Sequence, residues 1–307
     1  MSDFTFTPRF ITTPSGARLR TAVFPSAEGE VAQRVCVLLH GQTEFIEKYA
    51  EVIGEPQSRG YTVATFDWRG QGGSSRALED RRKAHVGDFR EYDEDLTTFL
   101  EQVVKPLGST APLALAHSMG AHILLRCLHD HPRAIGAAVL SAPMMAASTR
   151  GYPRWFAAAI TAAMNLFGRG NAWVLGMEAR DPLKLAFEDN IVTSDHARWA
   201  RAQQLVVANP DIRLAGPTWS WLKAASASMA TVMRPGYPEA IETPVLICGA
   251  GKDRIVLTAA AREFAKRLPK GRYVEFEDSE HEILMENDSI RTRFWKEFDA
   301  FVAANGS

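Results

Sequence analysis

Short strand-like runs alternate with helical stretches along most of this chain, and this rhythm limits what it can fold into. Residues 35–39 are wholly apolar, a helical stretch at 45–58 follows, and the next strand-like run is 61–66. Apolar strands joined through helices form right-handed crossovers, which build a mostly parallel sheet with helices on its faces. Further strand-like runs are 113–116, 137–140, 243–247 and 272–276. The sequence therefore predicts an α/β fold.

The rhythm breaks after Pro143. From 144 to 239 the chain has amphipathic helical patterns and no convincing strand, and the strand pattern then resumes. Connections in α/β folds are short, so a block of this length is an insertion with its own role. We expect residues 1–143 and 240–307 to form a discontinuous core, and 144–239 to form a helical lid (cap) over a site. The expected helices of the lid are 154–167, 195–208 and 218–233.

Ser118 lies between an apolar run and a helical stretch, in the sequence Ala116-His117-Ser118-Met119-Gly120. A serine nucleophile at such a place needs a sharp strand-to-helix turn. The residues two before and two after it must then be nearly free of side chain. Glycine is usual at both, and here Ala116, the smallest alternative, stands at the first. Because this turn is typical of α/β hydrolases, we predict that fold, with Ser118 as the nucleophile.

A serine is a poor nucleophile until a histidine, itself held by a carboxylate, removes its proton. In α/β hydrolases the acid and then the histidine follow the serine along the chain. Asp253 and His281 follow the last two expected strands, at the carboxyl ends where open α/β sheets form their sites. We predict Asp253 as the acid and His281 as the general base. Asp278 is an alternative acid, but it would have to double back over three residues.

Acyl transfer also needs two backbone N–H groups aimed at the oxygen that becomes negative. In α/β hydrolases one belongs to the residue after the nucleophile, here Met119, and one to the loop after an earlier strand. That loop begins His40-Gly41-Gln42, and Gln42 is the expected second donor. The alternative is an ordinary strand-to-helix turn without a role in catalysis.

Four motifs are spread along the chain. They are His40-Gly41-Gln42-Thr43-Glu44, Phe66-Asp67-Trp68-Arg69-Gly70-Gln71-Gly72-Gly73-Ser74, His117-Ser118-Met119-Gly120 and Ser279-Glu280-His281-Glu282. Together they resemble the lysophospholipase and monoacylglycerol lipase group of α/β hydrolases, which is also classed with the serine aminopeptidases. Trp68 and Gln71 make the bacterial lysophospholipases the best match within that group.

The resemblance extends into the expected lid through Thr193-Ser194-Asp195 and Gly216-Pro217-Thr218-Trp219. It implies a lid, no cofactor, and hydrolysis of a carboxylic ester of a single-chain lipid, a lysophospholipid or a monoacylglycerol. In the glycine-rich motif we expect Asp67 and Arg69 to brace the loop through a buried ion pair.

The expected lid is rich in large apolar side chains, with five of the seven tryptophans of the chain. An acyl-binding tunnel under the lid would use such residues. Trp219 and Met229 are the candidate lining residues, and packing between lid helices is the alternative.

The same triad could support other reactions. An aminopeptidase would need acidic groups in the lid to hold a substrate ammonium, and Glu178, Asp181, Glu188 and Asp189 are available. A small-ester esterase or an acyltransferase would differ only in the substrate or the acceptor. Epoxide hydrolysis and dehalogenation need an aspartate where this chain has Ser118. A non-catalytic binding protein would have no use for an intact triad.

The formal net charge of −1 argues against nucleic acid or an anionic membrane as the main partner. We expect a small-molecule or lipid ester as partner, with at most peripheral membrane contact, and leave the oligomeric state open. The spacing of Cys36, Cys127 and Cys248 fits neither a zinc site nor a disulfide framework, so no metal is expected. Without a signal-like N-terminus or an apolar stretch of ~18 residues, a cytoplasmic location is expected.

Overall fold

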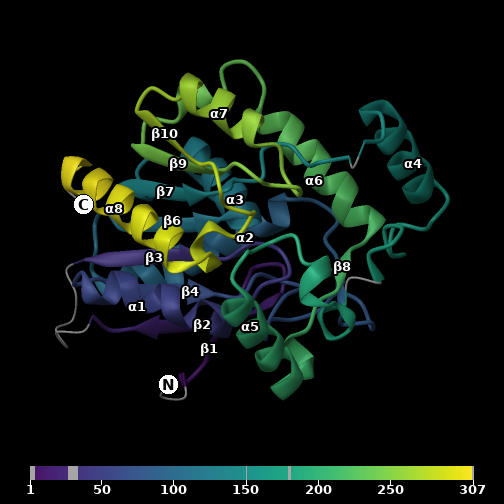
Figure 1. The fold of residues 1–307 in the computed structure, drawn as a ribbon, viewed down its shortest axis with the longest axis horizontal. Coiled ribbons are helices and arrows are strands. Elements are labelled where there is room, and N and C mark those ends of the chain that lie inside the picture. Colours follow the sequence, from purple (N-terminus) through teal and green to yellow (C-terminus); the bar gives the residue numbers. More distant parts are fainter. Residues whose placement is uncertain (1–3, 27–33, 150, 179–180, 306–307) are drawn as a thin grey trace.

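The computed structural model describes residues 4–26, 34–149, 151–178 and 181–305, and one eight-stranded sheet lies at its centre (Figure 1). The strand order across the sheet is β1-β2-β4-β3-β6-β7-β9-β10. The bounds are β1 (Arg9–Thr12), β2 (Arg18–Phe24), β3 (Val35–Leu39), β4 (Thr62–Phe66), β6 (Leu113–His117), β7 (Ala137–Ser141), β9 (Val245–Ala250) and β10 (Gly271–Phe276). The β1–β2 and β2–β4 pairs are antiparallel and every other neighbouring pair is parallel. The predicted mostly parallel sheet is confirmed.

The chain changes direction across the sheet at β3. β4 follows β3 in sequence and pairs with one of its edges, whereas β6 pairs with the other edge. In open α/β sheets, ligands bind outside the carboxyl ends of the strands at such a reversal point. The loops after β3 and β6 are therefore where this topology places a site.

Alternate residues of the strands face two helical layers. In β3, Val35, Val37 and Leu39 join a core that includes residues of α2, α3 and α7, whereas Cys36 and Leu38 join a core that includes residues of α1 and α8. Figure 1 shows α1 and α8 in front of the sheet. The bounds are α1 (Ala50–Ser58), α2 (Arg90–Phe99), α3 (Ser118–Asp130), α7 (Thr258–Arg267) and α8 (Asp288–Asn305). Burial on both faces explains why the strands read as continuous apolar runs.

Short helices join these elements. A 3₁₀ turn leads into α1, and a π-helical stretch continues α2 to Val104. The short helices are η1 (Ile46–Tyr49), η2 (Leu100–Val104), η3 (Lys105–Leu107), η5 (Pro182–Lys184), η6 (Phe187–Asp189), η7 (Pro210–Ile212), η8 (Pro238–Ala240) and η9 (Ile283–Met285).

The chain between β7 and β9 contains the three expected helices, α4 (Arg154–Leu166), α5 (His196–Ala208) and α6 (Trp219–Val232). Its described residues also include a strand, β8 (Gly216–Pro217), which pairs with β5 (Lys83–Ala84). The expectation of no strand is wrong at this point. A strand of two residues has no periodicity to detect, and its partner lies more than a hundred residues away in the sequence.

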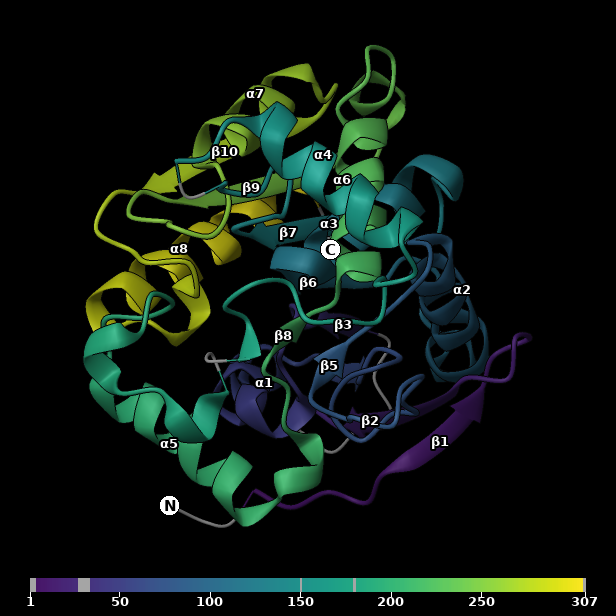
Figure 2. The same cartoon turned by 90° about the vertical axis from the view of Figure 1, so that its right-hand side faces the viewer.

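The inserted helices differ in how they are packed. α6 contacts α3, and the fully buried side chains of Ala225 and Val232 belong to the same core as that helix. α4 packs on α6 (Figure 2), and α5 contacts η1. The division into a core at 1–143 and 240–307 and a lid at 144–239 stays a prediction, since α6 is continuous with the core.

No helix in the described part of the chain is long and apolar enough to cross a membrane. Cys36, Cys127 and Cys248 are buried and free, and burial raises the pKa of each thiol. A thiol with a raised pKa is a poor nucleophile at neutral pH.

Candidate active site

Ser118 stands at a tight turn between β6 and α3. Its φ is +48°, in the left-handed region, and its side chain is buried at the start of α3. Gly120 permits this turn, since a Cβ there would lie 2.5 Å from the carbonyl oxygen of His40. Ala116 is fully buried in the core, which shows that a methyl group fits at the position two before the serine.

Three side chains from separate loops form one hydrogen-bonded chain. The Oγ of Ser118 lies 2.9 Å from Nε2 of His281, and Nδ1 of His281 lies 2.6 Å from Oδ2 of Asp253. A carboxylate accepts only, so Nδ1 carries the proton, and Nε2 is left to accept from the serine hydroxyl. The fold thus brings together the three residues that the sequence predicts as nucleophile, base and acid.

The carboxylate of Asp253 is held from several sides. Its Oδ1 accepts backbone N–H groups from Ile255 at 2.8 Å and from Val256 at 2.9 Å. Burial would raise the pKa of Asp253, but the hydrogen bond and charge of His281 and the two N–H groups hold that pKa below its usual range. The alternative acid, Asp278, is exposed and pairs with Lys252 at 3.0 Å.

A second histidine lies beside His281. The ring centroids of His117 and His281 are 4.8 Å apart, and Nδ1 of His117 lies 3.1 Å from the carbonyl oxygen of Ser141. Burial lowers the pKa of His117 to about 4, although the Glu44 carboxylate opposes the shift. His117 is therefore neutral at physiological pH and adds no positive charge beside the His281 ring.

The loop after β3 is fixed on both sides of Gln42. The N–H of Gly41 donates to Oε2 of Glu44 at 2.5 Å, and the N–H of Thr43 donates to Oε1 of Gln71 at 2.6 Å. Thr43 has a φ of +65°. Between them, the N–H of Gln42 has no acceptor among the described residues. Met119 is the second residue of α3, where helical N–H groups have no partner within the helix.

One lysine bridges two buried glutamates next to the site. Nζ of Lys48 donates to Glu44 at 2.8 Å and to Glu282 at 2.6 Å, and the hydroxyl of Tyr49 donates to Glu44 at 2.8 Å. Burial would raise the pKa of Glu44, but the Lys48 charge holds it far below its usual range. Burial keeps the pKa of Glu282 above its usual range despite the same lysine. Because Glu282 follows His281 in sequence, this cluster links the loop of Gln42 to the loop of His281.

The expected ion pair between Asp67 and Arg69 is wrong. Asp67 accepts from Nε of Arg20 at 2.6 Å and from the N–H of Gly73 at 2.8 Å. Arg69 instead donates from Nε to Asp95 at 2.8 Å. Each of the two side chains therefore has its own buried partner of opposite charge, Arg20 for Asp67 and Asp95 for Arg69. The glycine-rich loop is braced by separate ion pairs at Asp67 and at Arg69, rather than by one pair between them.

Trp219 and Met229 both lie in α6 and are buried. Met229 belongs to the core shared with α3, and the backbone carbonyl of Trp219 accepts from Nδ2 of Asn165 in α4 at 3.1 Å. Nε1 of Trp219 is buried and has no hydrogen-bond partner among the described residues. A role of these two residues towards a substrate stays a prediction.

Lys48, Gln71 and Glu282 are parts of this site that were not expected from the sequence. Glu44 and Lys48 are four residues apart, a spacing at which opposite charges meet on a helix, and this signal could have identified the pair. Gln71 and Glu282 fall inside the quoted motifs, but no sequence rule says which backbone group a buried amide or carboxylate will reach.

Three features together define an α/β hydrolase. The strand order reverses at β3, a serine lies at the turn from β6 to α3, and a histidine follows the last strand. Structural similarity supports this class. A soluble variant of monoglyceride lipase from Saccharomyces cerevisiae, solved with a substrate analogue, superposes with a TM-score of 0.74 at 18% identity, covering 98% of this chain and 96% of that one.

Sequence comparison identifies the family. Residues 30–288 match the family described as serine aminopeptidase, S33, and the chain belongs to this family. It is 32% identical over 269 residues to lysophospholipase L2 of Escherichia coli K12, covering 84% of this chain and 77% of the relative. It is 29% identical over 270 residues to the probable lysophospholipase L2 of Haemophilus influenzae, covering 88% and 84%. The resemblance to the lysophospholipase and monoacylglycerol lipase group is confirmed.

Proposed function

We propose that this protein hydrolyses the carboxylic ester of a single-chain lipid, a lysophospholipid or a monoacylglycerol, through an acyl-enzyme on Ser118. Ser118 attacks the ester carbonyl while His281 takes its proton, and Asp253 holds the imidazole in the required tautomer. The N–H groups of Gln42 and Met119 hold the oxyanion. His281 then protonates the leaving alcohol and activates the water that releases the fatty acid.

The observation that carries this proposal is the chain of two hydrogen bonds from Ser118 through His281 to Asp253, at 2.9 and 2.6 Å. A general base must lie within hydrogen-bond reach of the proton that it removes, and this one does. The unpaired N–H of Gln42, held between two fixed peptides, supports its role as an oxyanion donor.

The substrate class rests on the relatives and on one apolar surface. The relatives reported above are named lysophospholipases, and the yeast neighbour a monoglyceride lipase. α4 exposes large apolar side chains, with Trp155 at 72%, Leu166 at 82% and the adjoining Phe167 at 77% exposure. Exposed apolar groups of this size are typical of lipid or protein contact, and we propose that this surface meets lipid peripherally. The cytoplasmic location expected from the sequence stays a prediction, for which cell fractionation is the test.

An aminopeptidase is the second candidate, because the family description names that activity. Of the acidic lid residues considered for it, Asp181 is buried, with its carboxylate 3.6 Å from both Arg82 and Arg213. Glu188 and Asp189 are exposed. A carboxylate between two arginines is poorly placed to bind a substrate ammonium, which leaves the exposed Glu178, Glu188 and Asp189 for that role. Lipid ester hydrolysis is the better supported function because the relatives are named lysophospholipases.

The test combines labelling with a substrate panel. A fluorophosphonate should modify Ser118 and no other serine, and Ser118→Ala should leave only a slow residual rate, since the oxyanion hole alone retains a small part of the acceleration. Lysophosphatidylcholine, monoolein and aminoacyl-anilides are then compared by kcat/KM. Labelling of another serine, or substantial turnover by Ser118→Ala, would refute the mechanism. A higher kcat/KM for the anilides would show that the protein is an aminopeptidase rather than a lipid ester hydrolase, and the mechanism through Ser118 would still hold.

A further inference from the structure

The residues just before α5 run beside the loop that carries His281. The N–H of Glu282 donates to the carbonyl oxygen of Val192 at 2.7 Å, and the hydroxyl of Thr193 donates to the carbonyl oxygen of Met285 at 2.7 Å. The motif that the sequence analysis singles out in the insertion, Thr193-Ser194-Asp195, lies in this segment. The contact therefore joins the insertion to the residues on the C-terminal side of His281.

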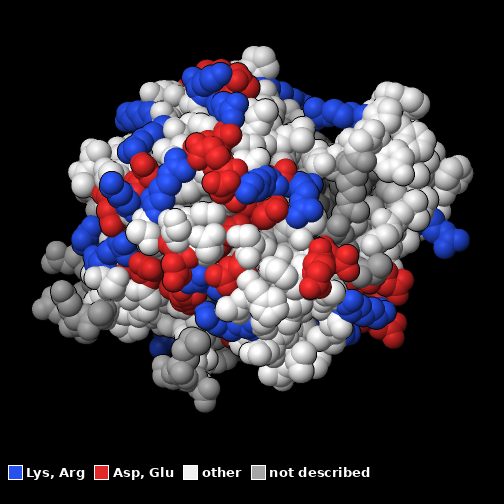
Figure 3. Space-filling model, in the orientation of Figure 1, with Lys and Arg blue, Asp and Glu red and all other residues white. Residues whose placement is uncertain are grey.

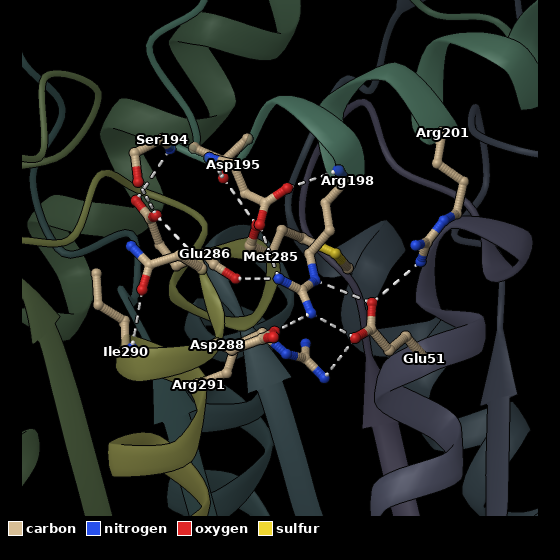
Figure 4. A network of polar contacts seen from close by, with 12 residues as sticks. Glu51, Ser194, Asp195, Arg198, Arg201, Met285, Glu286, Asp288, Ile290 and Arg291 are labelled. Carbon is tan, nitrogen blue, oxygen red and sulfur yellow. Dashed lines mark hydrogen bonds and ion pairs between the residues drawn. The ribbon is translucent and has the colours of Figure 1, made fainter.

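One buried carboxylate fixes both segments. Glu286 is fully buried, and its Oε1 accepts the N–H of Glu280 at 2.9 Å and the N–H of Ser194 at 3.2 Å. Its Oε2 accepts the hydroxyl of Ser194 (Figure 4). Glu280 immediately precedes His281, so Glu286 holds the peptide that leads into His281 and ties it to the insertion.

Arg198 anchors this segment to the sheet domain. Asp195 caps α5 by accepting the N–H of Arg198 at 2.9 Å. The Arg198 guanidinium binds both oxygens of Glu51 in α1, at 2.9 and 2.6 Å, and Asp288 in α8 at 2.6 Å (Figure 4). It also donates to the carbonyl oxygen of Glu286 at 2.9 Å. The hydrogen bonds from Arg198 hold the pKa of Glu51 at about 2, so this pair is ionised throughout the physiological range.

We infer that the insertion is a working part of the catalytic frame, with Glu286 and Ser194 as positioning residues that set the place of His281. They act through the backbone of Glu280 and Glu282, on either side of the histidine, and touch neither substrate nor reacting atoms. α5 is then a fixed support rather than a moving cover. This inference rests on the proposed function, because it assigns His281 the role of general base.

The test compares Glu286→Ala with Glu286→Gln. A misplacement of a reacting group by about 1 Å costs on the order of a hundred-fold in rate, so Glu286→Ala should lower kcat by about that factor. KM should stay within about two-fold, because the substrate contacts remain. Glu286→Gln keeps an oxygen for the N–H groups of Glu280 and Ser194 and should recover most of kcat.

The matched control is Arg201→Met. Arg201 also joins α5 to Glu51, at 3.0 Å, but it makes no hydrogen bond to the loop that carries His281. The kcat of Arg201→Met should therefore equal that of the parent. The downfield proton resonance of Nδ1–H of His281 gives a readout without substrate. It should broaden or vanish in Glu286→Ala and persist in Arg201→Met.

Parental kcat and an intact resonance in Glu286→Ala would overturn the inference, as would an equal loss of kcat in Arg201→Met. If Glu286→Ala does not fold, the double variant Thr193→Val/Ser194→Ala removes the side-chain hydrogen bonds that the insertion makes to Met285 and Glu286. This variant should lower kcat and leave KM unchanged. If the parent cleaves no ester, the proposed function fails, and the resonance still decides whether Glu286 positions His281.

Discussion

Ser118 adopts a backbone conformation that serine rarely occupies. A positive φ costs a non-glycine residue on the order of 1–3 kcal/mol, and it persists only where the surroundings enforce it. Here the Ser118 carbonyl accepts the N–H of Met144 at 3.1 Å, and Gly120 packs against the carbonyls of the loop after β3. The strain is useful, because it directs Oγ away from the helix and towards the His281 ring.

At the same scale, Asp253→Asn should separate the acid from the base. An asparagine cannot hold Nδ1–H of His281 in the same way, so kcat should fall by about 10⁴ while substrate binding stays near normal. The matched control is Asp278→Asn. The exposed pair of Asp278 with Lys252 lies outside the triad, so kcat should stay near the parental value, and the free energy of unfolding should change by no more than about 0.5 kcal/mol. Steady-state kinetics on a p-nitrophenyl ester checks both, and a larger loss in Asp278→Asn would show that the acid is misassigned.

Lys48→Met should make stability depend on pH in a defined direction. Loss of the lysine leaves two buried carboxylates unpaired, which should cost roughly 3–5 kcal/mol of unfolding free energy at neutral pH. The raised pKa of Glu282 would rise further. A carboxyl with a raised folded-state pKa favours the fold below its unfolded pKa of about 4.3, and this gain is lost as pH rises through the folded value.

The difference in Tm between Lys48→Met and the parent should therefore be small near pH 5 and large near pH 8. Lys48→Arg keeps the charge and serves as the control, with a smaller loss and little pH dependence. A difference in Tm that is the same at every pH would mean that the cluster is not held by charge.

At the scale of the element, α6 packs on the core with one part of its surface and on α4 with another. Its N-terminal end holds Trp219, which meets α4 through Asn165, and its C-terminal half enters the core shared with α3. Thr218 caps the helix by accepting the N–H of Trp221. Only those side chains of α6 that are not already packed against the core can line an acyl site.

If Trp219 and Met229 line an acyl tunnel, activity should rise with chain length, since each buried CH₂ adds up to ~0.8 kcal/mol. Trp219→Asp and Met229→Asp should then penalise long esters far more than acetate, because a long chain must desolvate the new carboxylate. The measurement is the ratio of kcat/KM for decanoate to that for acetate.

Val232→Asp is the control on the same helix, since Val232 is fully buried in the core. It should lower Tm and leave the ratio unchanged. If Trp219→Asp and Met229→Asp behave in the same way, these two side chains only pack the helix.

At the scale of the whole molecule, charged side chains and exposed apolar side chains lie on different parts of the surface. Figure 3 shows acidic and basic side chains intermixed over the sheet domain, and a largely uncharged surface over α4. The net charge of −1 gives no long-range attraction to anionic partners. Contact with a lipid surface would therefore depend on the apolar side chains of α4 rather than on charge.

Trp155→Glu combined with Leu166→Glu should weaken binding to phosphatidylcholine vesicles, since a charged side chain on this face resists transfer out of water. Hydrolysis of a soluble short-chain ester should be unchanged. Lys266→Glu, on the exposed face of α7, is the control for a change of charge elsewhere. Vesicle co-sedimentation measures the effect, and equal binding by parent and variant would exclude α4 as a lipid contact.

The sequence by itself determined the features that repeat locally or lie in one short segment. Apolar runs and helical periods place the strands and helices of the sheet domain, since each reflects burial on a known face. The turn at Ser118 is readable because small residues on both sides are a steric requirement. The order of Ser118, Asp253 and His281 is readable because parallel strands bring their carboxyl ends to one edge.

Only the tertiary structure decided which distant groups meet. Asp67 pairs with Arg20 rather than Arg69, and β8 finds a partner far back in the chain. Glu286 reaches Ser194 and Glu280 because the fold brings the start of α5 beside the loop before α8, where Arg198 joins Asp288 and Glu51, and no local pattern encodes this meeting. A buried polar group must find a partner, but which one it finds depends on the packing of the whole chain.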